Sequence, residues 1–145
     1  MSHLLQSWRF WALAAACFAA LTAILAKVGV SGVQSDVATL VRTAVILIFA
    51  GAIVVGSGQS AGLAQISGRS LVFLVLSGLA TGASWLCYFR ALSLGDAARV
   101  APLDKLSVVL VALLGASLLG ETLTLAAWAG VALIAAGAAL VASGW

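Results

Sequence analysis

Five long apolar runs constrain the fold of this chain more than any other feature. An α-helix rises 1.5 Å per residue, so about 20 apolar residues cross the roughly 30 Å hydrocarbon layer of a bilayer. The runs predict transmembrane helices over residues 8–27, 37–56, 70–89, 101–120 and 122–143. They leave about 45 of the 145 residues for both ends and four loops. We therefore expect an all-α integral membrane protein that forms a single membrane domain over residues 1–145.

Composition excludes several other classes of protein. The chain is 64% hydrophobic and 8% charged, whereas soluble domains carry about 45–50% apolar and about 25% charged residues. Seven basic residues against four acidic ones form no basic patch, so nucleic acid is not expected as a partner. His3 is at a terminus, and Cys17 and Cys87 are isolated in apolar runs, where we expect buried small side chains. No metal, cofactor or disulfide is expected.

The first apolar run follows a basic residue, as the apolar part of a cleavable signal does. It continues through Ala26, well beyond Cys17 and its faint similarity to a lipoprotein cleavage site. A lipid-modified cysteine is normally followed by a polar chain instead. We therefore expect the first helix to be retained.

Lys and Arg counts, which set the orientation of membrane proteins, differ by only one residue between the two sets of loops, and by three when the two residues just inside the helices are included. Five helices place the termini on opposite sides of the membrane. With the N-terminus inside, the inner loops hold Arg9 and Arg69, the outer loops hold Lys27, Arg90 and Arg99, and Arg42 and Lys105 lie just inside adjoining helices. So weak a signal permits insertion of the chain in both orientations. The alternative is that Lys and Arg counts in the short loops of so small a protein are noisy and that a single orientation prevails.

Several segments carry the landmarks of a known family. They are FAALTAILAKVGV, ATLVRT, YFRALSLGDAARVAPLDKLSVVLVALLGASLLGETLT and GVALIAAGAAL. Ala-Leu follows the third helix, Ala-Pro-Leu opens the fourth, and Leu-Gly-Glu closes it. In this order the landmarks resemble one EamA-type repeat of the drug/metabolite transporter superfamily, from about residue 11 to residue 141.

The resemblance implies a transporter that needs a second copy of the repeat. Most members of that family carry two five-helix repeats of opposite orientation and export amino acids or other small metabolites, whereas this chain holds one. A second copy is therefore expected to supply the missing half, in agreement with the charge counts. The first helix lacks the membrane-embedded Glu of the superfamily's four-helix multidrug exporters, which disfavours proton-coupled export of drug cations by that chemistry.

Arg42 is the first candidate for the substrate path. In a helix that begins near Val37 it lies about one and a half turns inside, roughly 7–8 Å along the axis. Its guanidinium can bind a carboxylate or phosphate in bidentate fashion. The structural alternatives are that it extends to the lipid headgroups or pairs with Asp36 or Asp104.

Asp104 and Lys105 are the next candidates, and two geometries remain open. If Pro102 is the first helical residue, both charges are interfacial. If the helix begins near Ala97, Pro102 kinks it and leaves both charges on a cavity wall. Glu121 is expected to cap the fifth helix.

Trp85 and Tyr88 share one helix face at a spacing of three residues, so they either line the mouth of a path or settle at the membrane interface. Small residues mark faces for close helix approach: Gly78 and Gly82 in the third helix, and Ala126, Gly130 and Gly137 in the fifth. These faces serve either a dimer interface or packing within the chain.

Two classes of function remain. The first is a secondary transporter, an exporter of a small polar metabolite such as an amino acid or organic anion, that works as an antiparallel homodimer in the cell (inner) membrane. The alternative is a non-transporting membrane subunit, or a helper of lipid-linked sugar flipping, that needs a different partner chain. An enzyme is not expected, because the spans hold no His/Asp/Glu cluster or nucleophile–base pair.

Overall fold

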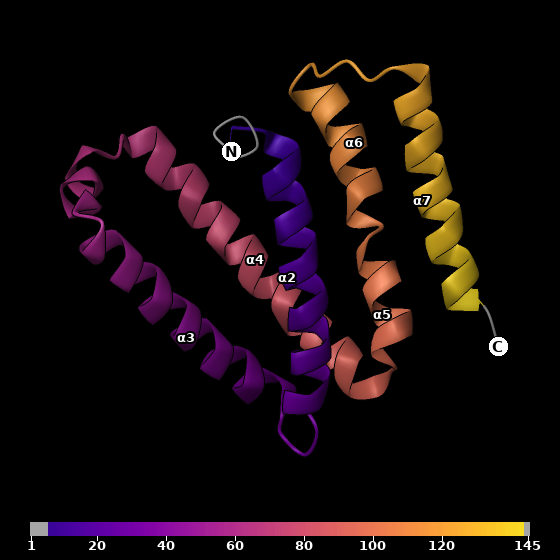
Figure 1. The fold of residues 1–145 in the computed structure, drawn as a ribbon, viewed down its shortest axis with the longest axis horizontal. Coiled ribbons are helices and arrows are strands. Elements are labelled where there is room, and N and C mark those ends of the chain that lie inside the picture. Colours follow the sequence, from indigo (N-terminus) through magenta and orange to yellow (C-terminus); the bar gives the residue numbers. More distant parts are fainter. Residues whose placement is uncertain (1–5, 144–145) are drawn as a thin grey trace. The chain divides into compact units, whose positions relative to one another are not determined.

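The computed structural model describes residues 6–143, and the regular structure within them is helical. His3 lies outside the described residues. The elements, shown in Figure 1, are α2 (Trp8–Gly29), α3 (Ser35–Gly56), the 3₁₀-helix η1 (Gln59–Gln65), α4 (Gly68–Leu94), α5 (Ala97–Asp104), α6 (Ser107–Leu118) and α7 (Leu125–Ser143).

Five segments are long and apolar enough to cross a membrane, which confirms the predicted number of spans. They are α2, α3, α4, α5 together with α6, and α7, with 22, 22, 27, 22 and 19 residues. α4 continues beyond the predicted end at residue 89, because no helix-breaking residue follows until Gly95. Arg90 ends the apolar run but not the helix, since a charged side chain does not interrupt the backbone hydrogen bonds.

The fourth span is broken between α5 and α6 (Figure 1). Pro102 lies inside α5 rather than at its first position, and it has no N–H to donate to the carbonyl of Ala98. The amides of Lys105 and Leu106 each donate to the carbonyl three residues earlier, at 3.1 and 3.0 Å, which is the tighter 3₁₀ pattern. The helix therefore begins at Ala97 and the span breaks after Pro102, as in the second of the two geometries that the sequence left open. The cavity wall of that geometry stays a prediction.

The turn into the last helix differs from the prediction. Gly120, with φ of 68°, turns the chain after α6, and the amide of Glu121 donates to the carbonyl of Gly115 at 3.1 Å. Thr124 is the cap of α7, because its Oγ1 accepts the N–H of Ala127 at 3.2 Å. The expectation that Glu121 caps this helix is wrong. Because the cap is Thr124, α7 begins at Leu125 rather than at residue 122.

The chain divides into two compact units, and the first combines residues 6–25 with residues 94–143. In it α5 and α6 pack against α7. Gly115 is buried there, and a Cβ added to it would lie 2.7 Å from Oε2 of Glu121. The missing side chain of Gly115 therefore lets the Glu121 carboxylate lie against α6.

The second unit, residues 26–93, holds the last turn of α2, all of α3 and η1, and nearly all of α4. α3 packs against η1. The buried residues of this unit are Ala26, Val30, Ser35, Thr39, Phe89 and Leu92. They come from the end of α2, the start of α3 and the end of α4, so the core of this unit lies at one end of its helices.

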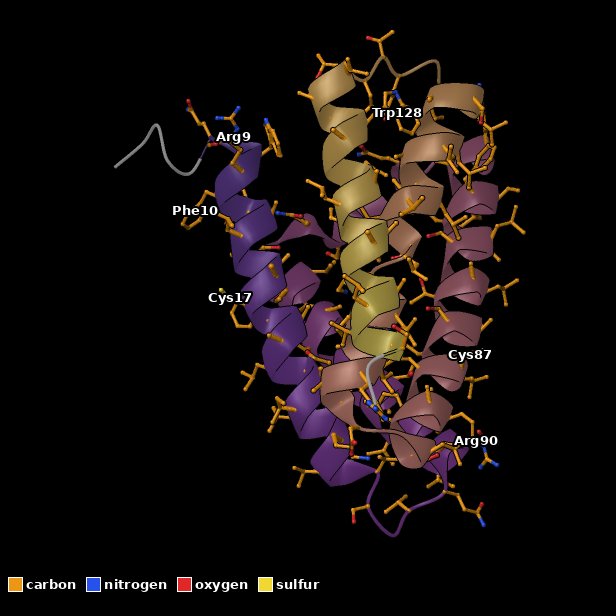
Figure 2. All side chains as sticks on the ribbon, turned by 90° about the vertical axis from the view of Figure 1, so that its right-hand side faces the viewer. Arg9, Phe10, Cys17, Cys87, Arg90 and Trp128 are labelled. Carbon is orange, nitrogen blue, oxygen red and sulfur yellow. The ribbon has the colours of Figure 1, made fainter. Side chains whose placement is uncertain are left out.

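Most apolar side chains project away from the chain, as Figure 2 shows. No more than 11% of the residues in any candidate span are buried. Cys17 on α2 and Cys87 on α4 are both exposed, so the expectation that they are buried is wrong. Within each unit the spans bury little of their surface against one another, and lipid can cover such side chains as well as protein does.

Candidate functional site

Arg42 lies on the buried face of α3. The helix begins at Ser35, so Arg42 is seven residues into it, about 10 Å along the axis and deeper than a start at Val37 implies. Ser35 and Thr39 share this face and are 8% and 6% exposed. The hydroxyl of Thr39 donates a hydrogen bond to the carbonyl of Ser35 at 2.9 Å, so the hydroxyl proton has an acceptor inside the span.

The guanidinium of Arg42 stacks on Trp85 of α4. Its Cζ lies 3.2 Å from the centroid of the Trp85 ring and 5.9 Å from that of Phe89. Cation–π attraction acts within about 6 Å of a ring centroid, so Trp85 supplies most of it. Asp36, the one carboxylate among residues 26–93, accepts a hydrogen bond from the Ser35 hydroxyl at 3.2 Å and forms no ion pair with Arg42. The structure therefore contradicts the Asp36 pairing.

Two further rings hold Trp85 in place. Tyr88 meets it edge-on at 5.4 Å between centroids and 80° between planes, and Phe89 lies at 5.8 Å and 60°. Such pairs contribute about 0.5–1.5 kcal/mol each beyond their burial. Phe89 is 3% exposed and anchors the group. The spacing of Trp85 and Tyr88 correctly predicts their shared face, and their place at the mouth of a path stays a prediction.

Lys27 is the residue of this unit that sequence reasoning missed. It flanks the first apolar run as interfacial lysines commonly do, and nothing near it in the sequence points to α4. Its Nζ donates to the carbonyl of Leu92 at 2.8 Å. That carbonyl is in the last turn of α4, where carbonyls lack intrahelical partners and a nearby cation is favourable.

A cleft of about 490 Å³ opens beside this contact. One wall is formed by the end of α2 and the loop that follows it, and the other by Leu92 and Ser93. All of the lining residues belong to the unit of residues 26–93.

Asp104 and Lys105 pair with each other at 3.1 Å, at the break between α5 and α6. Their side chains are 36% and 53% exposed. An exposed pair of this kind contributes about 0–1 kcal/mol, so it holds the break only weakly. Both residues belong to the unit that contains residues 94–143, and their place in a substrate path stays a prediction.

The small residues on α4 and α7 lie in open space. A Cβ added to Gly78, Gly82, Gly130 or Gly137 would meet no atom within 4 Å, and Ala126 is exposed. Within each of the two units, no described helix makes the close approach that these positions allow. Their role as a dimer interface or as packing within the chain stays a prediction.

Comparisons with known proteins agree with this architecture. The model of the EamA-like transporter family matches residues 6–143. A protein of Sinorhizobium sp named "Uncharacterized transporter in cobO 3'region" is 65% identical over 137 residues, which cover 94% of this chain and 97% of that protein. No solved structure matches the chain. The family match confirms the resemblance to an EamA-type repeat.

Proposed function

The chain belongs to the EamA-like transporter family and is a multi-pass membrane transporter, and we propose that it exports a small polar metabolite with a carboxylate group, such as an amino acid or organic anion. The observation that carries this proposal is the stack of Arg42 on Trp85. A helical membrane protein of this kind fits the inner membrane, since outer-membrane spans are β-barrels.

A stacked guanidinium remains available to an anion. The indole ring of Trp85 meets the face of the Arg42 guanidinium, whereas its N–H donors lie in its plane around the edge. No carboxylate within residues 26–93 pairs with this charge, and an unpaired cation inside a span is costly. A substrate carboxylate bound in bidentate fashion at the edge would supply the missing partner.

Hydroxyl groups extend the polar character of α3 around Arg42. Thr39 and Thr43 donate to the carbonyls of Ser35 and Thr39, at 2.9 and 2.8 Å. Hydroxyls that donate to the backbone keep lone pairs as acceptors. The ammonium group of an amino acid bound at Arg42 would therefore find acceptors on the same helix.

Flux through the purified, reconstituted protein tests this function. Vesicles are assayed with a panel of amino acids, organic anions, nucleosides and cations. Arg42→Lys keeps the charge but loses the bidentate geometry, so it should lower carboxylate flux about tenfold, the effect of one charged hydrogen bond of roughly 1.5 kcal/mol. Arg42→Ala should abolish flux while the protein remains in the membrane.

Arg90→Ala is the matched control, because Arg90 is an exposed arginine of α4 and should tolerate the change. Full activity of Arg42→Ala would remove Arg42 from the mechanism. Absence of flux for every member of the panel in the wild-type protein would favour the alternative, a non-transporting subunit that needs a different partner chain.

We also propose that the working unit is an antiparallel homodimer. One five-helix repeat resembles half of a transporter built from two inverted repeats, and an inverted copy would restore the two-fold arrangement around a central path. The near-balanced loop charges permit both insertions. The open positions at Gly78, Gly82, Gly130 and Gly137 offer smooth faces to a second copy.

A further inference from the structure

The break between α5 and α6 leaves two backbone carbonyls without the donors that a continuous helix supplies (Figure 1). Pro102 has no N–H for the carbonyl of Ala98. The amide of Lys105 would donate to Ala101 in an α-helix, but it donates to Pro102 at 3.1 Å instead. Inside a membrane such carbonyls are tolerated only where another group, protein or water, satisfies them. The break therefore offers oxygen ligands at membrane depth.

The carboxylate of Asp104 lies at the same break and is only partly engaged. Asp104 is the eighth residue of the 22-residue span Ala97–Leu118, about 10 Å from its start. Its Oδ2 meets Nζ of Lys105 at 3.1 Å, longer than the roughly 2.7–2.9 Å of a good charge-assisted bond. Among the described residues no donor contacts Oδ1. The carboxylate therefore keeps most of its capacity to accept.

The helices packed around the break bring no further charge to it. α6 lacks ionisable side chains, and so does α7, which packs against both α5 and α6. On α5, Arg99 precedes Asp104 by five residues, which is about 140° around the helix axis, so it lies on another side. Lys105 is thus the cation that the described structure places on the carboxylate.

We propose that the carboxylate of Asp104 and the carbonyl of Ala101 bind Na⁺, and that Lys105 competes with the ion for the carboxylate. Ala101 and Asp104 are three residues apart and so face one side of the helix. One carboxylate with neutral carbonyl oxygens matches a single positive charge, and broken helices offer such carbonyls to ions. The coupling of this ion to export rests on the proposed function; its binding at the break does not.

The pair of Asp104 and Lys105 is open enough for an ion to replace the ammonium. The side chains are 36% and 53% exposed, and an exposed pair is weak. Sequence reasoning expected no metal because it counts side-chain ligands, and the described residues hold no group of three His, Cys, Asp or Glu. Backbone carbonyls become ligands only where a helix breaks, which depends on the hydrogen bonds around Pro102.

Thermal unfolding of the purified protein in phosphatidylcholine nanodiscs tests Na⁺ binding without any need for transport. Melting temperatures are compared in NaCl, KCl and choline chloride at equal ionic strength. Na⁺ at about ten times its Kd should raise the melting temperature by about 2–4 °C over choline. Asp104→Asn should abolish this shift. Asp36→Asn, which changes an exposed carboxylate of α3, is the matched control and should keep it.

Two further variants separate this site from a general effect of salt. Lys105→Gln removes the competing cation, so the Na⁺ concentration that gives half of the shift should fall by up to about fivefold. Pro102→Ala lets the helix continue, so that the amide of Lys105 can donate to Ala101 again, and the shift should shrink. The variants of the two adjacent residues, Asp104 and Lys105, thus have opposite effects on the affinity for Na⁺.

Equal stabilisation by Na⁺, K⁺ and choline overturns the proposal, as does a shift that survives in Asp104→Asn. A Na⁺ requirement that stays the same or rises in Lys105→Gln overturns the competition, and this variant decides the matter even if Asp104→Asn does not fold. Stabilisation that follows pH instead of Na⁺ would make a proton the occupant and overturn the Na⁺ site. A Na⁺ shift in a protein without carboxylate flux would refute the proposed function and leave the ion site standing.

Discussion

Replacing Trp85 with Leu should release the guanidinium of Arg42 and weaken binding of the substrate. The Cζ of Arg42 lies 3.2 Å from the Trp85 centroid, whereas Phe89, at 5.9 Å, is at the limit of effective range. Loss of the indole therefore removes nearly all of the cation–π attraction. At a half-buried site this attraction is about 1–2 kcal/mol, which corresponds to a five- to thirtyfold change in the population of the stacked arrangement.

The apparent affinity of a site falls in proportion to the population of its binding-competent form. We therefore expect the KM of carboxylate flux to rise by up to that factor in Trp85→Leu. Trp85→Phe keeps a ring and should show a smaller rise. Trp8→Leu, which removes a 73% exposed indole from α2, is the control and should leave the KM unchanged.

The stack itself has a direct spectroscopic readout. In nanodiscs, the Nε–H signal of Arg42 should show an upfield ring-current shift that disappears in Trp85→Leu. A KM within twofold of wild type, in a variant that has lost the shift, would show that the stack does not prepare Arg42 for the substrate. Absence of the shift in the wild-type protein would refute the stack.

Three further predictions concern the span break, the last turn and assembly. Pro102→Ala restores an N–H for the carbonyl of Ala98, so thermal unfolding should show a stabilisation of about 1–3 kcal/mol. Flux should fall because the break between α5 and α6 becomes stiffer, and unchanged flux would show that transport does not use the break. Gly115→Ala gains up to about 1 kcal/mol of helix propensity and displaces only the flexible end of Glu121, so its melting temperature should be equal or higher; a marked drop would contradict this. Two or three lysines added to one set of loops should fix the orientation and abolish flux, and the oppositely biased variant should restore it on co-expression; a biased variant that is active alone would exclude the antiparallel dimer.

The number of spans follows from the sequence because the length of an apolar run is a local property. Helix ends follow less well, because they depend on hydrogen bonding rather than on charge. Arg90 predicted the end of the third span, but α4 continues to Leu94. Glu121 was expected to cap the last helix, but the hydroxyl of Thr124 is the cap. Pro102 shows the intermediate case, since its chemistry predicts a kink but leaves open where the helix begins.

The candidate site was only partly accessible from the sequence. Arg42 stands out because a charge inside an apolar run is costly and needs a reason. Its contact with Trp85, and the contact of Lys27 with Leu92, 65 residues away, depend on how helices meet and not on spacing along one helix. A lysine at the end of a run is so common at membrane interfaces that Lys27 carried no distinguishing signal.

Exposure of apolar side chains does not by itself argue for a second copy of this chain. Lipid tails are as apolar as leucine, so the outward-facing Leu, Val and Ile of these spans gain nothing by leaving lipid for another helix. Close backbone approach and interhelical contacts of small residues do favour association, and these are what Gly78, Gly82, Gly130 and Gly137 offer from positions where a Cβ would meet no atom. The case for the dimer therefore rests on those open positions, on the single repeat and on the balance of loop charges, and the added-lysine variants test the last of these directly.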